Sequence, residues 1–163
     1  MSSTNTPLLE APDFCLPDQD GRRFHLREQR DFGVVVVVFI RGHWCPYCRR
    51  YLGKLQANFP RFREFASQLI AISPEPQATS RQLAEELKLS FPLLRDASGE
   101  IIDRYGTRNG HAGRGTLLPH PSVFVIDAGG TIRFRSIDRN YQKRTTMRTI
   151  FSVLASLRDA GTD

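Results

Sequence analysis

The sequence predicts an α/β protein with a mixed central sheet flanked by helices and an N-terminal β-hairpin extension. Strand patterns alternate with amphipathic helical patterns along the chain, which is typical of β-α-β units. Two further strand patterns near the C-terminus are joined by a short turn rich in glycine. The chain has 163 residues, of which 40% are hydrophobic, enough for one domain with its own core. We expect a flexible N-terminus at residues 1–10 and a single domain at residues 11–163.

The first elements are a small hairpin and a buried strand. Turn residues separate two short strand-like pieces within residues 11–21 and 22–26. Residues 34–40 then form an unbroken run of β-branched and aromatic side chains, the pattern of a strand that is covered on both faces. This run is expected to be a central strand.

An amphipathic helix is predicted directly after that strand. Pro46 suits its first turn, because the N–H that proline lacks has no intrahelical partner there. Pro60 should kink or split the helix. Apolar side chains recur at steps of three and four, the spacing of a helix packed on a sheet. They are Cys48, Leu52, Leu55, Phe59 and Phe62.

The rest of the chain continues the alternation. The predicted elements are a central strand, a helix, a short helix, the two strands of a hairpin and a C-terminal helix, at residues 69–72, 79–88, 98–105, 122–127, 131–137 and 145–157. Residues 106–119 carry four glycines and are expected to form a mobile loop. The order β-α-β-α-β-β-α behind an N-terminal hairpin is that of an elaborated thioredoxin fold.

Two of the three cysteines lie three positions apart, where the predicted helix begins. Thiol–disulfide exchange needs a thiolate that attacks and a second sulfur close enough to resolve the mixed disulfide, and Cys45 and Cys48 supply both. Helix N–H groups and the charges of Arg41, Arg49 and Arg50 favour a thiolate at Cys45. Because Cys48 lies on the apolar stripe, we expect Cys45 to be the more accessible thiol and to have the lower pKa.

Other uses of the cysteines and histidines have less support. A zinc site would need two more ligands, and Cys15, His43, His111 and His120 offer no second clustered pair. We therefore expect no metal and no cofactor. Cys15 is interpreted as a packed residue of the hairpin rather than a third redox group. Trp44 is expected to shield the dithiol.

The net charge of +6 permits attraction to acidic surfaces. The arginines are scattered rather than gathered in one run, which favours a solvated basic surface over a nucleic-acid site. The first ten residues lack the pattern of a signal peptide, and no apolar run approaches the roughly 18 residues of a membrane span. We expect a cytoplasmic protein with neither a membrane nor a nucleic acid as partner.

Several segments resemble one known family, the alkyl hydroperoxide reductase/thiol-specific antioxidant family of peroxiredoxin-like redoxins. They are APDFCLPDQDG at residues 11–21, FIRGHWCPYC at 39–48, AISP at 71–74, FPLL at 91–94 and FVID at 124–127. The resemblance covers residues 11–157 in order and spacing. It implies a thioredoxin-like fold and a thiol-dependent redox activity.

The active-site motif of the family, Pro-x-x-x-Thr-x-x-Cys, is only partly present. Its proline position is occupied by Arg41, its threonine position by Cys45 and its cysteine position by Cys48. The later arginine of the family falls near Pro121. The resemblance thus implies a peroxidase in which Cys48 is the peroxidatic and Cys45 the resolving cysteine, and three family positions differ.

These differences point toward thioredoxin-like oxidoreductases, in which the first cysteine of the pair attacks. Such proteins carry a cis-proline just before the equivalent strand, so the His120–Pro121 bond is expected to be cis. The dipeptide Pro46-Tyr47 between the cysteines resembles that of glutaredoxins. Arg41, Trp44, Pro46, Tyr47 and Pro121 are the residues that we expect to shape the site.

The leading hypothesis is a thiol-dependent oxidoreductase that cycles through a Cys45–Cys48 disulfide and performs thiol–disulfide exchange. The alternative is a peroxiredoxin-type antioxidant that reduces hydroperoxides. Both need a thiol reductant as partner, either a thioredoxin-like protein or a low-molecular-weight thiol. A metal-binding or nucleic-acid-binding module has no supporting motif, and a homodimer is compatible with the sequence.

Overall fold

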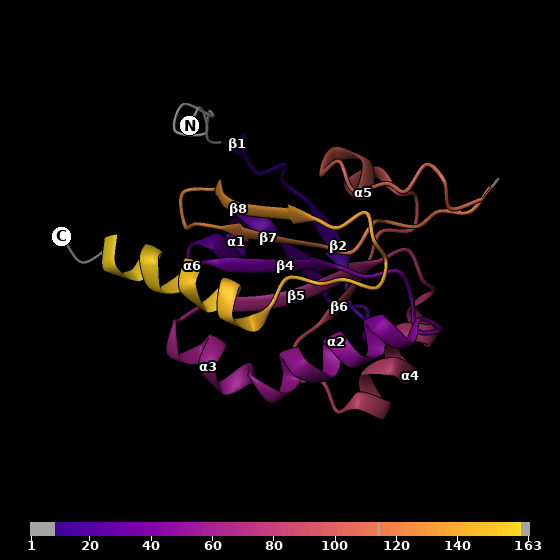
Figure 1. Ribbon diagram of the computed structural model, residues 1–163, viewed down its shortest axis with the longest axis horizontal. Coiled ribbons are helices and arrows are strands. Elements are labelled where there is room, and N and C mark those ends of the chain that lie inside the picture. Colours follow the sequence, from indigo (N-terminus) through magenta and orange to yellow (C-terminus); the bar gives the residue numbers. More distant parts are fainter. Residues whose placement is uncertain (1–8, 114, 161–163) are drawn as a thin grey trace.

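The computed structural model describes residues 9–113 and 115–160. A six-stranded sheet forms its centre, with helices on both faces and a separate two-stranded hairpin (Figure 1). The strands are β1 (Leu9–Glu10), β2 (Cys15–Pro17), β3 (Arg23–His25), β4 (Val35–Phe39), β5 (Gln68–Ser73), β6 (Leu93–Arg95), β7 (Ser122–Ile126) and β8 (Thr131–Ile137). The helices are α1 (Leu26–Arg30), α2 (Pro46–Ala57), α3 (Phe59–Glu64), α4 (Gln77–Leu87), α5 (Glu100–Arg104) and α6 (Met147–Ala160).

The central sheet is mixed, as predicted, with the strand order β1-β8-β7-β4-β5-β6. β4 pairs in parallel with β5 and antiparallel with β7, and β5 pairs in parallel with β6. The parallel β4–β5 pair requires a crossover between the strands, which α2 and α3 provide. The antiparallel β2–β3 pair confirms the N-terminal hairpin.

β4 has the buried, central position that its sequence predicts. Val36 and Val38 belong to the apolar cluster beneath α2, α3 and α6, whereas Val35 and Val37 belong to the cluster that includes the hairpin and α5. All five strand residues are buried. A continuous apolar run is therefore required, because both faces of this strand are covered.

The helix break predicted at Pro60 is confirmed. α2 ends at Ala57, Asn58 lies between the helices, and α3 begins at Phe59 with proline in its first turn. The apolar stripe of α2 is buried against the sheet through Cys48, Leu52 and Leu55, and α3 contributes the buried Phe62. None of the helices within the described residues is long and apolar enough to cross a lipid bilayer.

Two segments differ from the expectation of irregular structure. Within residues 1–10, Leu9 and Glu10 form β1 on the edge of β8, and residues 1–8 lie outside the described residues. The two arms of the 106–119 loop also pair with each other. Asn109 N donates to Leu118 O at 2.8 Å, and a β-bridge joins Arg108 to Pro119. Backbone hydrogen bonds thus give this glycine-rich loop a hairpin-like base.

Candidate active site

The two neighbouring cysteines lie where β4 ends and α2 begins. Cys45 is the N-cap of α2, with φ −90° and ψ 114°, and Pro46 occupies the first turn. The Cys45 Sγ atom accepts a hydrogen bond from the Cys48 backbone N–H, at an N–S distance of 3.4 Å. The sulfur thus takes the place of the oxygen that usually caps a helix, facing the N–H groups that favour a negative charge.

The loop between β4 and α2 is fixed to the end of the neighbouring strand. His43 donates its backbone N–H to Glu75 Oε1 at 2.8 Å, and its ring contacts the other oxygen of the same carboxylate. Gly42 allows the Trp44 indole to fold back over the loop, because a Cβ atom at Gly42 would lie 2.5 Å from Trp44 Nε1. Trp44 is half exposed and lies beside the dithiol.

Two arginines contact the sulfurs. Arg41 Nη1 lies 3.8 Å from Cys45 Sγ, and the Arg41 backbone N–H donates to Cys48 Sγ at 3.3 Å. Arg144 Nη2 lies 3.3 Å from Cys48 Sγ and 4.0 Å from Cys45 Sγ. The dithiol is therefore bracketed by two positive charges, one from the end of β4 and one from the segment that precedes α6.

The other two arginines expected to act on the thiols face elsewhere. Arg49 is paired with Glu86 on α4 and donates to the His43 carbonyl. Arg50 lies over the Tyr47 ring, with its guanidinium carbon 5.8 Å from the ring centre. Both lie on α2 next to the dithiol in sequence, but successive helix residues point in different directions, so neither contacts a sulfur.

Cys45 is far less exposed than expected, at only 1%, although it is less deeply buried than Cys48. The Arg41 guanidinium lies between two aromatic rings, 4.9 Å from the centre of Trp44 and 4.9 Å from that of Tyr141. Tyr141 also contacts Tyr47 edge to face at 5.6 Å. We call these four side chains the aromatic–arginine cover. It lies beside the dithiol, which accounts for the low exposure of Cys45.

The predicted order of the two thiol pKa values agrees with the environment of each sulfur. Burial opposes ionisation of Cys45, but hydrogen bonds from the Cys48 N–H and thiol, with the charge of Arg41, hold the pKa of Cys45 below its ordinary value. Deeper burial raises the pKa of Cys48, and its neighbour Cys45 adds to that rise. In the reduced protein the first negative charge therefore resides on Cys45.

The expectation of a cis bond at His120–Pro121 is also wrong, since the described residues contain no cis peptide bond. Pro121 directly precedes β7, so the chain enters the strand at this point. Pro121 O accepts from Asp138 N at 2.8 Å, which extends the β7–β8 ladder, and His120 N donates to Thr107 O. These hydrogen bonds hold the backbone in the extended course of the strand.

The third cysteine lies apart from the dithiol. Cys15 is exposed on β2 opposite His25, so it is not the packed residue that was expected. Its hairpin contributes to the apolar cluster on one face of the sheet, and the dithiol belongs to the cluster on the other face. Within the described range, no three His, Cys, Asp or Glu side chains gather in an arrangement that could hold a metal ion.

Comparison with known proteins places this geometry in a family. The model of the AhpC/TSA family matches residues 8–135, most of the chain. The chain belongs to the AhpC/TSA family. Alkyl hydroperoxide reductase E of Mycobacterium bovis is 34% identical over 126 residues, which are 76% of this chain and 80% of that protein. The crystal structure of peroxidoxin BcpB from Mycobacterium tuberculosis has a TM-score of 0.80 and 27% identity, covering 93% of this chain and 96% of that one.

A second kind of relative is named for a different activity. The thiol-disulfide oxidoreductase ResA of Geobacillus thermodenitrificans is 28% identical over 124 residues, which are 76% of this chain and 64% of that protein. The chain thus spans slightly less than two thirds of this relative. These comparisons confirm the family resemblance and the thioredoxin-like fold.

Arg144 and Tyr141 are the residues at the dithiol that the sequence did not reveal. They lie beyond the matched residues 8–135, and Arg144 is 99 positions from Cys45. Arg144 belongs to no motif and is one of many scattered arginines. The sequence holds one hint: the later arginine of the family is missing near Pro121, so another arginine could be expected to take its place.

Proposed function

We propose that this protein is a thiol-dependent oxidoreductase that carries two electrons on the Cys45–Cys48 dithiol. The proposal rests on the arrangement of the two sulfurs. Cys45, the thiol with the lower pKa, caps a helix, and Cys48 follows one turn later. Two guanidinium groups contact the pair. This arrangement supplies a thiolate at one position and a resolving thiol at the next, as disulfide exchange requires.

In the main proposal the acceptor is a disulfide. The Cys45 thiolate attacks one sulfur of the substrate, the substrate S–S bond breaks, and one half leaves as a thiolate that takes up a proton. Cys48 then loses its proton and attacks Cys45 Sγ. The Cys45–Cys48 bond forms while the second half of the substrate leaves, so that the protein is oxidised by two electrons and the substrate is reduced. A thiol reductant reverses these steps.

A second candidate is reduction of a hydroperoxide, and Arg144 is the observation that favours it. Its guanidinium lies 3.3 Å from Cys48 Sγ and can supply the positive charge that the family's later arginine provides elsewhere. The Cys48 thiolate would attack the peroxide, giving a sulfenic acid and an alcohol. The Cys45 thiol would condense with the sulfenic acid to give the disulfide and water. The same thiol reductant would restore both cysteines.

Stopped-flow measurements on single-cysteine variants separate the two candidates. We would compare Cys45→Ser and Cys48→Ser, each with Cys15→Ser, against hydrogen peroxide and an aromatic disulfide. Disulfide exchange requires that Cys48→Ser still forms a mixed disulfide and that Cys45→Ser does not. Peroxide reduction requires that Cys45→Ser still forms a sulfenic acid and that Cys48→Ser does not.

The Cys15→Ser protein is the matched control, and it should retain both reactions. If neither reagent oxidises the dithiol of this control faster than it oxidises free cysteine, the proposed function is wrong.

The proposed setting is the cytoplasm, where dithiols are kept reduced and where catalytic cysteine pairs, rather than structural disulfides, are the usual finding. The chain has only three cysteines, two of which form this pair, so it offers no framework of structural disulfides, and this supports the setting. The proposed partners are a thiol reductant and a disulfide or hydroperoxide substrate, and a second copy of the chain is compatible with the proposal. Arg41, Trp44, Pro46 and Tyr47 are proposed to shape the site. Pro121 is left out because its predicted cis bond is absent.

A further inference from the structure

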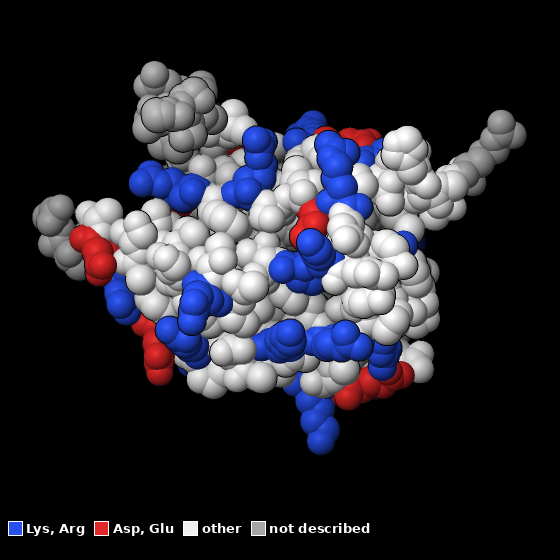
Figure 2. Space-filling model, viewed as in Figure 1, with Lys and Arg blue, Asp and Glu red and all other residues white. Residues whose placement is uncertain are grey.

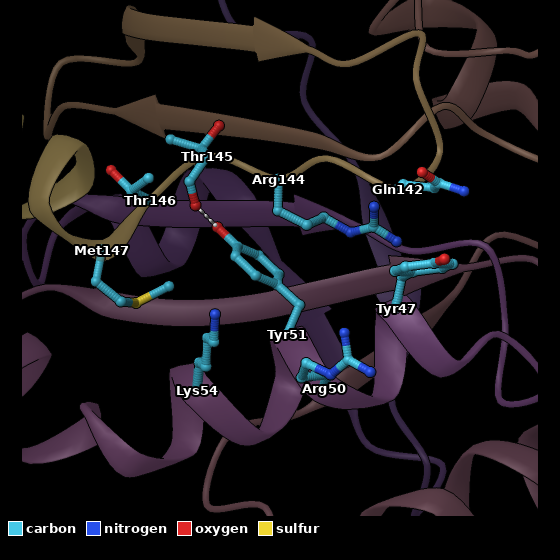
Figure 3. Close-up of a pocket in the computed structure, with 9 residues that line it drawn as sticks. All are labelled: Tyr47, Arg50, Tyr51, Lys54, Gln142, Arg144, Thr145, Thr146 and Met147. Atoms are coloured by element: carbon cyan, nitrogen blue, oxygen red, sulfur yellow. Dashed lines mark hydrogen bonds between the residues drawn. The ribbon is translucent and has the colours of Figure 1, made fainter.

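A cavity of about 380 Å³ lies beside the dithiol, between α2 and the segment that leads into α6 (Figure 3). Cavities of this size are in the range that binds small organic molecules. The residues that line it are Tyr47, Arg50, Tyr51, Lys54, Gln142, Arg144, Thr145, Thr146 and Met147. No carboxylate is among them.

Three of the lining side chains are cationic. Arg50 and Lys54 rise from successive turns of α2, and Arg144 lies across the cavity from them (Figure 3). Like charges at positions i and i+4 destabilise a helix, and here no carboxylate of the cavity compensates them. Figure 2 shows that a row of basic side chains also crosses the region of α2. The cavity therefore has a positive potential that attracts an anion.

Arg144 joins this cavity to the dithiol. The residue lines the cavity, and its Nη2 atom contacts both sulfurs, at 3.3 Å from Cys48 and 4.0 Å from Cys45. Within the described part of the chain its Nε atom is buried and has no hydrogen-bond partner, an uncommon state for such a donor. A molecule held against Arg144 thus reaches the immediate neighbourhood of the sulfurs.

The remaining walls suit an organic body rather than a bare inorganic ion. The Tyr47 and Tyr51 rings and the Met147 side chain give the cavity an apolar surface. The Tyr51 hydroxyl donates to Thr145 O at 2.7 Å, so this residue presents its ring rather than a free hydroxyl group. The cavity combines an apolar wall with a cationic rim, and Arg144 on that rim contacts the buried redox pair.

We propose that the cavity binds small carboxylate-bearing disulfides and the thiols formed from them, as redox substrates of the dithiol. The carboxylate would lie near Arg50 and Lys54, and the sulfur near Arg144. The proposal rests on the proposed disulfide exchange and follows the same steps: Cys45 and Cys48 lose two hydrogens, and one disulfide yields two thiols.

The kinetic test uses two aromatic disulfides of similar size in a Cys15→Ser background. One is 5,5′-dithiobis(2-nitrobenzoate), which carries a carboxylate on each half, and the other is 4,4′-dithiodipyridine, which carries none. The variants Arg50→Glu and Lys54→Glu should slow oxidation of the dithiol by the anionic reagent roughly ten-fold more than they slow its oxidation by the neutral reagent. The matched control is Arg63→Glu on α3, an exposed site with the same change in net charge.

A binding measurement keeps the two proposals distinguishable. Calorimetry should detect 3,3′-dithiodipropionate binding to Cys45→Ser/Cys48→Ser and should lose it when Lys54→Glu is added. Failure to bind, or an equal effect of Lys54→Glu and Arg63→Glu on the anionic reagent, would overturn the anion site while leaving disulfide exchange intact. If the neutral reagent also fails to oxidise the parent dithiol, the proposed disulfide exchange itself is wrong.

Discussion

Replacing Arg41 by methionine tests how the protein stabilises a thiolate at Cys45. The guanidinium Nη1 lies 3.8 Å from Cys45 Sγ. Opposite unit charges at this distance attract by about 1 kcal/mol in bulk water and about 4 kcal/mol at an effective dielectric constant of about 20. Because Arg41 is only half-buried, screening by solvent places its contribution toward the lower end, at about 1–2 kcal/mol.

The sign of the effect follows from the direction of the pKa shift. Arg41 lowers the pKa of Cys45, so its removal raises that pKa. At pH values well below the titration midpoint, the thiolate fraction of Arg41→Met should be about five- to thirty-fold lower than that of the parent. At pH values above both midpoints the two proteins should be equally ionised.

Ultraviolet absorbance of the thiolate measures this directly in a protein with Cys15→Ser and Cys48→Ser, where Cys45 is the only thiol. Absorbance is preferable to alkylation, because Arg41 is also part of the aromatic–arginine cover and its loss changes the access of the alkylating reagent to Cys45. Arg49→Met is the matched control, since Arg49 is paired with Glu86. An Arg41→Met titration that superimposes on the parent, or an equal shift in Arg49→Met, would refute the electrostatic argument.

Three further outcomes are expected. Mild oxidation should remove two hydrogens from the segment that contains Cys45 and Cys48, as detected by mass spectrometry of the digest, and a disulfide to the cysteine of the N-terminal hairpin would contradict this. Tyr141→Ala removes a cation–π contact worth about 0.5–2 kcal/mol from the cover and should speed alkylation of Cys45 about two- to thirty-fold. Asp96 accepts a hydrogen bond from Ile102 N at 2.8 Å, and burial raises the pKa of its carboxyl group. Because the folded-state pKa is the higher one, the protonated carboxyl group stabilises the fold at low pH, and this stabilisation is lost as pH rises through the folded-state pKa. In neutral urea titrations, an Asp96→Asn variant should match or exceed the parent, and Asp96→Ala should lose about 1–3 kcal/mol because the Ile102 N–H is left without an acceptor.

Most of the fold could be predicted because its signals are local. The valine run of β4 is apolar at every position since both of its faces are covered, and the stripe of α2 repeats at the helical period. The elements that were missed are short: β1, β6 and α1 have two, three and five residues. Such segments carry too little periodicity to be recognised, and β1 and β6 depend on pairing with distant strands.

The candidate site was predictable to the extent that one helix start defines it. Cys45 at the N-cap and Pro46 in the first turn could be placed from their spacing alone. The burial of Cys45 could not, because Tyr141 comes from the far end of the chain. The bond before Pro121 was predicted wrongly. The cis-proline of thioredoxin-like proteins suggested a cis bond, whereas the β7–β8 ladder continues through Pro121 in an extended backbone.

The contact between Arg144 and the two sulfurs makes the segment before α6 dependent on the state of the dithiol. Thr145 is held to α2 by the Tyr51 hydroxyl, and Arg144 is held by sulfur atoms that can bear negative charge. When the two sulfurs bond to each other, the negative charge on Cys45 is lost and the attraction of Arg144 to the sulfurs weakens, while its hydrogen bonds to the carbonyls of Tyr141 and Lys143 remain. Oxidation of the dithiol should therefore weaken the contact that ties the segment before α6 to the start of α2.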